Sequence, residues 1–286
     1  MRHNPVTGVT ILAAVAVAMG VCEVIRWNDD IFFEEYDCVT PEKFTMIVPG
    51  WKESCQTEWA VEMVSNFMVY RGGCIICMDY SKYSKTDDYF GELVPKFELV
   101  VDALLGKLRE MENRGFDSAN GHLFGFSFGA QSSIEAGRRF GLRKINRIDV
   151  CEPAGPGFDS DRVFSSLDTK AAAKNIQCIH TSRDKGTYRR ECHQDWNMGN
   201  CGANQVAAGK YPKGSHGLCP YFYNSAFQNE FRPIRKPKEC FSLRAVVTWP
   251  VGFRLGYFSN TTSGITGELY ARTTKAYPYN ELPNEV

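Results

Sequence analysis

The sequence lacks an excess of charge of either sign, with 33 Lys and Arg against 33 Asp and Glu in 286 residues. Proteins that bind nucleic acid normally carry a basic balance or a concentrated basic patch, and neither is present here. The composition, 43% hydrophobic and 23% charged, also excludes a disordered or collagen-like chain. We therefore expect a folded globular protein that recognises neither nucleic acid nor any other partner mainly through bulk charge.

Long apolar runs are absent outside residues 9–21, which follow a positively charged start. That run is too short for a good membrane span, and its small-residue exit is typical of a secretory signal peptide. Residues 1–22 are therefore predicted to be a signal peptide, cleaved after Cys22 or after Gly20, with an uncleaved signal anchor as the alternative. Residues 23–286 would then remain, without a transmembrane segment.

Cysteine, by contrast, is abundant, since 11 are present and cytosolic enzymes rarely hold so many. Cleavage after Cys22 would leave 11 − 1 = 10 cysteines, an even set, whereas cleavage after Gly20 would leave Cys22 free. Asn260 opens the single Asn-x-Ser/Thr sequon and is the predicted glycosylation site. These features favour a secreted, extracellular protein.

Repeats and linkers are also absent, and short apolar runs alternate with helical patterns. Such alternation is typical of an α/β fold with a mostly parallel central sheet and helices on both faces. The polar, Gly-rich stretch 182–217 is expected to form long loops. The predicted strands are Phe44–Val48, Cys74–Asp79, His122–Phe126, Ile145–Cys151, Ile176–His180 and Ala245–Trp249. The predicted helices are Glu58–Tyr70, Pro95–Asn113, Phe128–Phe140 and Tyr221–Phe231.

The motif Gly125-Phe126-Ser127-Phe128-Gly129 stands between a strand pattern and a helix pattern. This arrangement is typical of a nucleophile elbow in an α/β-hydrolase, a sharp turn that exposes a serine hydroxyl above the strand end. Ser127 is the predicted nucleophile. The amide of Phe128, at the start of the helix, is a predicted donor to an oxyanion.

A serine hydroxyl needs a base, and the base needs an orienting acid. The acid of an α/β-hydrolase follows the serine in the chain, which offers Asp149 and Glu152. Asp149 lies within a predicted strand, where burial of its charge is costly, whereas Glu152 lies at the strand exit before Pro153. Glu152 is therefore the predicted acid, with a structural, turn-capping carboxylate as the alternative.

Three histidines follow Glu152. His180 ends a predicted strand and is expected to be structural, and His193 lies beside Cys192 in a loop that it is expected to brace. His216 stands in the turn Gly214-Ser215-His216-Gly217, late in the chain and able to reach Ser127. His216 is the predicted general base.

Several motifs stand in the order of one known family. They are Gly121–Gln131, Arg147–Phe158, Ile179–Asp184, Cys192–Trp196 and Gly214–Phe227. Together they resemble the pancreatic-lipase-like family of secreted α/β-hydrolases, which includes triacylglycerol lipases, A1-type phospholipases and non-catalytic yolk proteins. The resemblance implies Ser127 as nucleophile, Glu152 as acid where most members have aspartate, and His216 as base. It also implies the Trp51 amide as a second oxyanion donor, although Pro49 replaces the histidine of the family's His-Gly pair.

Other features implied by the resemblance concern metal, lid and partners. Of the family's calcium ligands Asp168 alone matches and Ala171 stands in place of another, so neither metal nor cofactor is expected. The lid segment between about Cys201 and His216 is short. Family members with short lids resemble phospholipases or galactolipases more than enzymes that act on bulk triglyceride. Residues 23–286 are expected to form a single lipase domain, with no C-terminal sandwich domain and no colipase-like partner.

The resemblance also implies a disulfide pattern, in which Cys192 pairs with Cys201 and Cys219 with Cys240. Cys74 and Cys77 lie three apart in a strand and are not expected to pair with each other. Four further cysteines remain unassigned: Cys38, Cys55, Cys151 and Cys178.

The sequence thus predicts a secreted serine hydrolase that cleaves carboxylic esters of acyl lipids at a lipid interface. Two alternatives remain open: a non-catalytic lipid-binding or yolk-type protein on the same fold, and an esterase for small soluble esters.

Overall fold

The structure, a computed structural model, describes residues 22–210, 213–260 and 263–281. Nine strands form one sheet in the spatial order β1-β2-β4-β3-β5-β6-β7-β8-β9. They are β1 (Cys22–Arg26), β2 (Phe32–Tyr36), β3 (Phe44–Val48), β4 (Cys74–Asp79), β5 (Gly121–Phe126), β6 (Ile145–Cys151), β7 (Ala173–His180), β8 (Gln194–Met198) and β9 (Gly267–Ala271). From β4 to β9 all neighbours pair in parallel, whereas β1 and β2 pair antiparallel. The predicted mostly parallel sheet is confirmed.

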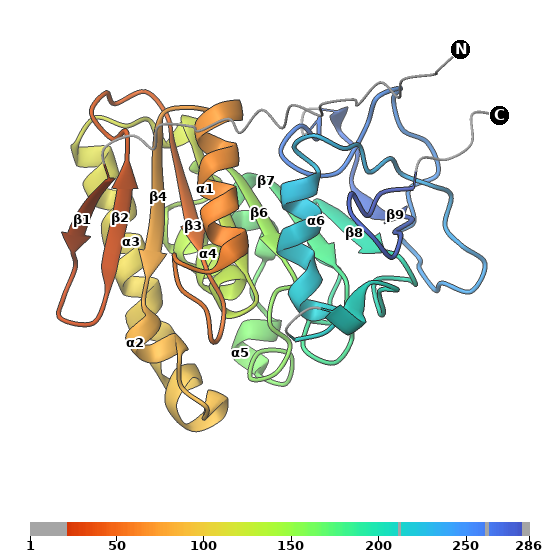
Figure 1. Cartoon of the computed structure of the whole chain (residues 1–286), viewed down its shortest axis with the longest axis horizontal. Helices are drawn as coiled ribbons and strands as arrows, with labels where there is room; N and C mark the ends of the chain where they lie inside the picture. Colours follow the sequence, from red (N-terminus) through yellow and green to blue (C-terminus); the bar gives the residue numbers. More distant parts are fainter. Residues whose placement is uncertain (1–21, 211–212, 261–262, 282–286) are drawn as a thin grey trace, which may run out of the picture.

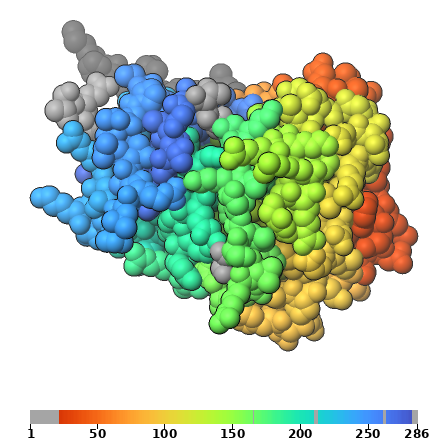
Figure 2. All heavy atoms as spheres, turned by 180° about the vertical axis from the view of Figure 1, so that it is seen from behind, coloured from red at the N-terminus to blue at the C-terminus, as the bar shows by residue number. Residues whose placement is uncertain are grey.

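Helices cover both faces of the sheet, as predicted. They are α1 (Glu58–Tyr70), α2 (Ser81–Ser84), α3 (Phe97–Asn113), α4 (Phe128–Phe140), α5 (Arg162–Ser165) and α6 (Cys219–Ser225). Short 3-10 or π turns are Tyr89–Leu93, Val94–Lys96, Ser118–Asn120, Thr169–Ala171, Ala208–Lys210 and His216–Leu218. Helices α1 and α6 lie on one face and α3 and α4 on the other (Figure 1). Seen from behind, the yellow and green side chains of residues 97–140 cover much of the second face (Figure 2).

The core is split by the sheet into two apolar layers. On one side, Val100, Leu104 and Leu108 of α3 are fully buried against the sheet, as the three- and four-residue spacing predicts. On the other, Trp59 of α1 packs against Phe124 of β5, with ring centroids 5.9 Å apart. Burial of each such side chain stabilises the fold by about 1.5–3 kcal/mol.

Some predicted elements differ from the structure. The stretch Ala245–Trp249 is not a strand, although Ala245 bridges Glu268 of β9, which supplies the actual last strand. Strand β8 lies inside the stretch 182–217 that was expected to form loops, because its polar side chains are buried and paired within the fold. Strands β1 and β2 were also not predicted, because they contain charged residues and so do not form apolar runs. Helix α6 begins earlier than predicted, with Pro220 in its first turn, and ends at Ser225.

The predicted signal peptide lies outside the described residues except for Cys22, which begins the edge strand β1 and is exposed without a disulfide partner. Within residues 22–210, 213–260 and 263–281, no helix has both the length and the apolarity that a membrane crossing requires.

Candidate active site

Ser127 occupies the turn between β5 and α4, at φ 56° and ψ −117°. A serine in this region of backbone space is strained and is held there by its surroundings. Both glycines of the motif lie at close approaches: a Cβ at Gly125 would lie 2.7 Å from Ala130 Cα, and one at Gly129 would lie 2.2 Å from Pro49 O. The predicted turn is therefore present, and its glycines let strand and helix cross closely.

His216 lies between Ser127 and Glu152. Its Nε2 is 2.9 Å from Ser127 Oγ, and its Nδ1 is 2.9 Å from Glu152 Oε2. Because an ionised carboxylate only accepts hydrogen bonds, the Nδ1–H donates to Glu152 and Nε2 accepts from the Ser127 hydroxyl. All three side chains are buried, with exposed fractions of 7% or less. The structure thus brings together the three residues selected from the sequence.

Glu152 follows β6 directly and has φ 49°, which turns the chain out of the strand. Its backbone N–H donates to Ile179 O at 2.8 Å. Its Oε1 accepts from the amides of Thr181 and of Ser182, the latter at 3.0 Å, and its Oε2 accepts from the Ser182 hydroxyl. Together with His216, four donors fix both carboxylate oxygens, which keeps a fully buried acid in one orientation.

The two predicted oxyanion donors belong to residues next to Ser127, one in the chain and one across the cavity. Phe128 is the first residue of α4, where backbone N–H groups have no acceptor within the helix. Trp51 lines the same cavity as Ser127, and a Cβ on the preceding Gly50 would lie 2.9 Å from Ser127 Cβ. The Gly50 amide is held by Glu53 Oε2 at 3.1 Å.

Glu53 and Lys213 are functional candidates that sequence reasoning did not select. Lys213 Nζ lies 2.7 Å from Glu53 Oε1 and 5.3 Å from the ring centroid of Phe126. The pair joins the Trp51 loop to the His216 loop. Burial lowers the pKa of Lys213, against the opposing effect of Glu53. No local motif marks this pair, since its members are 160 residues apart.

Asp149, the rejected alternative acid, is fully buried inside the sheet and does not contact Ser127. It accepts from Arg147 Nε at 2.8 Å and from Tyr223 Oη at 2.5 Å, and it lies 3.1 Å from His122 Nε2. Burial favours the neutral acid, but Arg147 and His122 outweigh that effect and hold the pKa of Asp149 well below its usual range. The expected cost of its burial is thus offset by paired donors.

The two other candidate histidines lie away from Ser127, as expected. His180 Nε2 is 3.1 Å from the buried Asp195 Oδ1 of β8. Burial lowers the pKa of His180, which favours its neutral form. His193 Nδ1 accepts from the Ile176 amide at 3.1 Å and so braces β7.

A cavity of about 340 Å³ opens beside Ser127 and His216. Its wall is largely apolar, formed by Trp51, Tyr89, Phe90, Ala154 and Pro156, with charged groups from Asp87, Asp88, Lys185 and Lys213. A volume of several hundred cubic ångströms with few polar groups is typical of sites for small apolar ligands.

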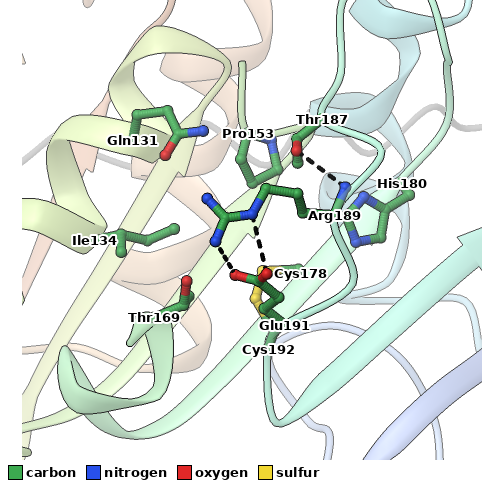
Figure 3. A pocket seen from close by; sticks show the side chains of 10 residues that line it. All are labelled: Gln131, Ile134, Pro153, Thr169, Cys178, His180, Thr187, Arg189, Glu191 and Cys192. Carbon is green, nitrogen blue, oxygen red and sulfur yellow. Dashed lines mark hydrogen bonds and ion pairs between the residues drawn. A yellow bond between two sulfur atoms is a disulfide. The ribbon is translucent and has the colours of Figure 1, made fainter. Parts of the chain in front are cut away.

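A second cavity, of about 40 Å³, is lined by Pro153, Gln131, His180 and Arg189, among others (Figure 3). The Arg189 side chain crosses it and pairs with Glu191, at 3.0 Å between Nε and Oε1. Since one water needs about 10–15 Å³ by the same measure, this space accommodates only a few waters. Only the larger of the two can accept an acyl chain.

The predicted disulfide pairing is wrong. In the described residues the pairs are Cys38–Cys74, Cys55–Cys77, Cys151–Cys219, Cys178–Cys192 and Cys201–Cys240. Cys192 does not pair with Cys201, because β8 runs beside β7 and brings Cys192 to Cys178. Cys219 does not pair with Cys240, because α6 begins beside the end of β6 and meets Cys151. Cys74 and Cys77 pair with different partners, as predicted.

The remaining predicted positions are local features. Asp168 caps its own turn, accepting from the Lys170 amide at 3.0 Å. Asn260 is exposed, and the two threonines of its sequon lie outside the described residues. Of the short lid segment, residues 211–212 lie outside the described residues, Val206 is exposed and Ala207 is buried.

The family model of the Lipase family matches residues 11–201. This chain belongs to the Lipase family. The predicted family and α/β-hydrolase fold class are therefore confirmed. The match includes Ser127 and Glu152, whereas His216 lies beyond it, so the choice of His216 depends on the geometry above.

Relatives of this Lipase-family chain include a phospholipase A1 of Polybia paulista, 34% identical over 130 residues, which are 43% of this chain and 40% of that protein. The human pancreatic lipase-related protein 2 is 28% identical over 141 residues, 49% of this chain and 29% of that protein. The matches thus span less than half of either curated relative. Among solved structures, an esterase of Pyrococcus furiosus aligns with TM-score 0.42 and 15% identity, over 60% of this chain and 74% of that chain.

Proposed function

We propose that this chain is a secreted serine hydrolase that cleaves carboxylic esters of acyl lipids, of lipase or phospholipase A1 type. The observation that carries the proposal is the hydrogen-bonded series Ser127–His216–Glu152, with 2.9 Å at each histidine nitrogen, beside a cavity with an apolar wall. A neutral histidine between a serine and a fixed carboxylate is the arrangement that makes an alcohol nucleophilic.

In the first half-reaction, His216 Nε2 takes the Ser127 proton while Oγ attacks the ester carbonyl carbon. The amides of Trp51 and Phe128 donate to the oxyanion of the tetrahedral intermediate, and each such donor contributes about a hundred- to a thousandfold in rate. Glu152 remains ionised and stabilises the imidazolium. His216 then protonates the leaving alcohol as its bond to the acyl carbon breaks, which leaves an acyl group on Ser127.

In the second half-reaction, His216 removes a proton from a water that attacks the acyl carbon. The intermediate collapses, the bond to Ser127 Oγ breaks, and His216 returns the proton to Oγ. The products are the free fatty acid and the enzyme with its Ser127 hydroxyl restored.

An acyl-lipid substrate is supported by the apolar wall of Trp51, Tyr89, Phe90 and Pro156 beside the nucleophile. The names of the two relatives, a phospholipase A1 and a pancreatic lipase-related protein, agree with this substrate class. Secretion is supported by the five disulfides among the described residues, because disulfides persist in oxidising compartments.

The test is labelling of the folded, oxidised protein with a fluorophosphonate, with Ser127→Ala as the variant and the exposed Ser166→Ala as its matched control. We expect one label on Ser127, lost in Ser127→Ala and retained in Ser166→Ala. An unlabelled Ser127 in folded protein would overturn the catalytic proposal and leave a lipid-binding role.

Substrate class requires a second assay, with phospholipid, galactolipid and triglyceride offered to the same protein. Rates on micellar and on monomeric esters are compared alongside. If the rate increases once the ester concentration exceeds the critical micelle concentration, a lipid hydrolase is supported. If the rate does not change at that concentration, an esterase for small soluble esters is supported.

A further inference from the structure

The Glu152 carboxylate fills a space that any side chain at residue 186 would need. A Cβ built on Gly186 would lie 2.4 Å from Glu152 Oε2, 2.8 Å from Cδ and 2.9 Å from Oε1. Contacts below 3.0 Å are not tolerated by real Cβ atoms, and this carboxylate is not a free side-chain end, because four donors hold it. Its buried position leaves it no solvent space into which to retreat.

The backbone at Gly186 does not itself require glycine. Its φ lies outside the left-handed range that L side chains avoid, unlike the φ of Gly199 or Gly202 in the following loop. Gly186 forms an antiparallel bridge with Ala154, and the Thr187 amide donates to Pro153 O at 2.7 Å. The backbone at residue 186 is thus compatible with alanine, and the three heavy atoms nearest to an added methyl all belong to the Glu152 carboxylate.

Ser182 connects the two residues. Its hydroxyl donates to Glu152 Oε2 and accepts from the Gly186 amide at 3.2 Å. The Gly186 amide therefore fixes the direction of the Ser182 hydroxyl, and the hydroxyl fixes the oxygen that accepts from His216 Nδ1. Both residues thus meet the acid at Oε2, the oxygen that accepts from His216.

We propose that Gly186 and Ser182 are positioning residues that adapt this site to a glutamate, rather than an aspartate, as the acid at position 152. Gly186 supplies the space that the additional methylene requires, and Ser182 supplies the hydrogen bond that returns Oε2 toward His216. This inference rests on the proposed function and specifies how its acid is held.

The experiment is a double-mutant cycle of Gly186→Ala and Glu152→Asp in the full chain. The readouts are the rate of Ser127 labelling by a fluorophosphonate and kcat/KM on a soluble ester. Gly186→Ala is expected to lower both about a hundredfold, because it displaces the carboxylate by about an ångström. Glu152→Asp withdraws the carboxylate from the methyl, so the double variant is expected to be about tenfold faster than Gly186→Ala alone.

Thermal unfolding of the same four proteins gives a readout that does not need activity. The methyl is expected to lower the Tm in the glutamate background and to lower it less in the aspartate background. Ser182→Ala is expected to slow labelling about tenfold and to shift the pH at which labelling is half-maximal, which a merely structural serine would not do.

The outcomes separate the two proposals. A wild-type protein that is folded but neither labelled nor active overturns the proposed function. An active wild type in which Gly186→Ala retains full activity, or in which Glu152→Asp gives no recovery in rate or Tm, overturns the positioning role alone. Recovery of both rate and Tm in the double variant supports it.

Discussion

Of the three buried histidine–carboxylate pairs in the part of the chain that the structure describes, two lie in contrasting surroundings. One, His216–Glu152, lies past the carboxyl ends of the strands, with 2.9 Å between nitrogen and oxygen. The other, His122–Asp149, lies between β5 and β6 within the sheet, at 3.1 Å. Both carboxylates are fully buried and both imidazoles nearly so. By distance and burial alone, the two pairs are almost the same.

They differ in what the second ring nitrogen meets. His216 Nε2 faces a serine hydroxyl at the elbow, whereas His122 Nδ1 has no hydrogen-bond partner in the part of the chain that the structure describes. The His122 ring is instead enclosed by Phe67 and Tyr257, at centroid distances of 5.2 and 5.9 Å. A histidine–carboxylate pair therefore indicates catalysis only when its other nitrogen reaches a reactive group.

The carboxylates differ in charge balance as well. Asp149 is paired with Arg147, whose guanidinium also donates to Gly256 O at 2.6 Å and to Tyr257 O at 2.7 Å. The Asp149–Arg147 ion pair therefore connects the sheet to the segment that leads to β9. Glu152 instead accepts from neutral amides and a hydroxyl, which leaves its charge available to an imidazolium.

The largest effect is expected when each histidine is replaced in turn. His216→Ala should lower kcat/KM on the order of 10⁵-fold or more, because the base of the series is lost. His122→Ala should leave kcat/KM of the folded protein within about threefold of the wild type and lower its stability instead. Steady-state kinetics with a soluble ester, together with thermal unfolding, check both, and an inactive, stable His122→Ala would break the comparison.

Replacing each acid by its amide should distinguish the role of Glu152 in catalysis from the role of Asp149 in stability. Glu152→Gln should lower kcat about 10⁴-fold, because the amide no longer stabilises the charged imidazole. It should lower the free energy of unfolding by only about 1–3 kcal/mol, because its NH2 group would face one of the donors that hold the carboxylate. Asp149→Asn should lower the free energy of unfolding by about 3–5 kcal/mol, because it leaves Arg147 buried without its counterion. Urea unfolding monitored by tryptophan fluorescence, with kinetics on the folded fraction, measures both.

A smaller loss is expected from Gly50→Ala. Its methyl would lie 2.9 Å from Ser127 Cβ and 3.0 Å from Phe126 O, so the Trp51 amide must move away from the nucleophile. We expect kcat to fall about a hundredfold, the scale of one oxyanion donor, with a nearly unchanged KM. If KM falls by the same factor, or if kcat does not fall, the assignment of the Trp51 amide as an oxyanion donor is wrong.

The smallest effect concerns pH and stability. Burial lowers the pKa of His122 to about 4, against the opposing effect of Asp149. Between that value and the unfolded value near 6.5 the unfolded chain binds the extra proton, so stability falls as pH falls through this window. From pH 6.5 to 5 this group should account for about 1.5 kcal/mol.

The check on that slope is urea unfolding across pH 5 to 7 in the wild type and in His122→Asn. The variant should lose the part of the pH dependence that His122 contributes. An identical slope in the two proteins would show that His122 is not the titrating group.

Much of the site follows from local sequence. The Gly125–Gly129 motif identifies Ser127, and the position of Glu152 before Pro153 predicts a strand exit, as β6 shows. Strand β8 and the disulfides were not predictable in this way. The buried polar residues Gln194, Asp195 and Asn197 have no apolar signature, and without β8 nothing places Cys192 beside Cys178.

By itself, the sequence determined the alternation of strands and helices, the turn at Ser127 and the order of serine, acid and base, because these depend on spacing between near neighbours in the chain. Only the tertiary structure decided which histidine faces the hydroxyl, which cysteines pair, and that residue 186 must lack a side chain beside Glu152. Those choices depend on strand order and on loops that meet across tens of residues, and no local pattern encodes such meetings.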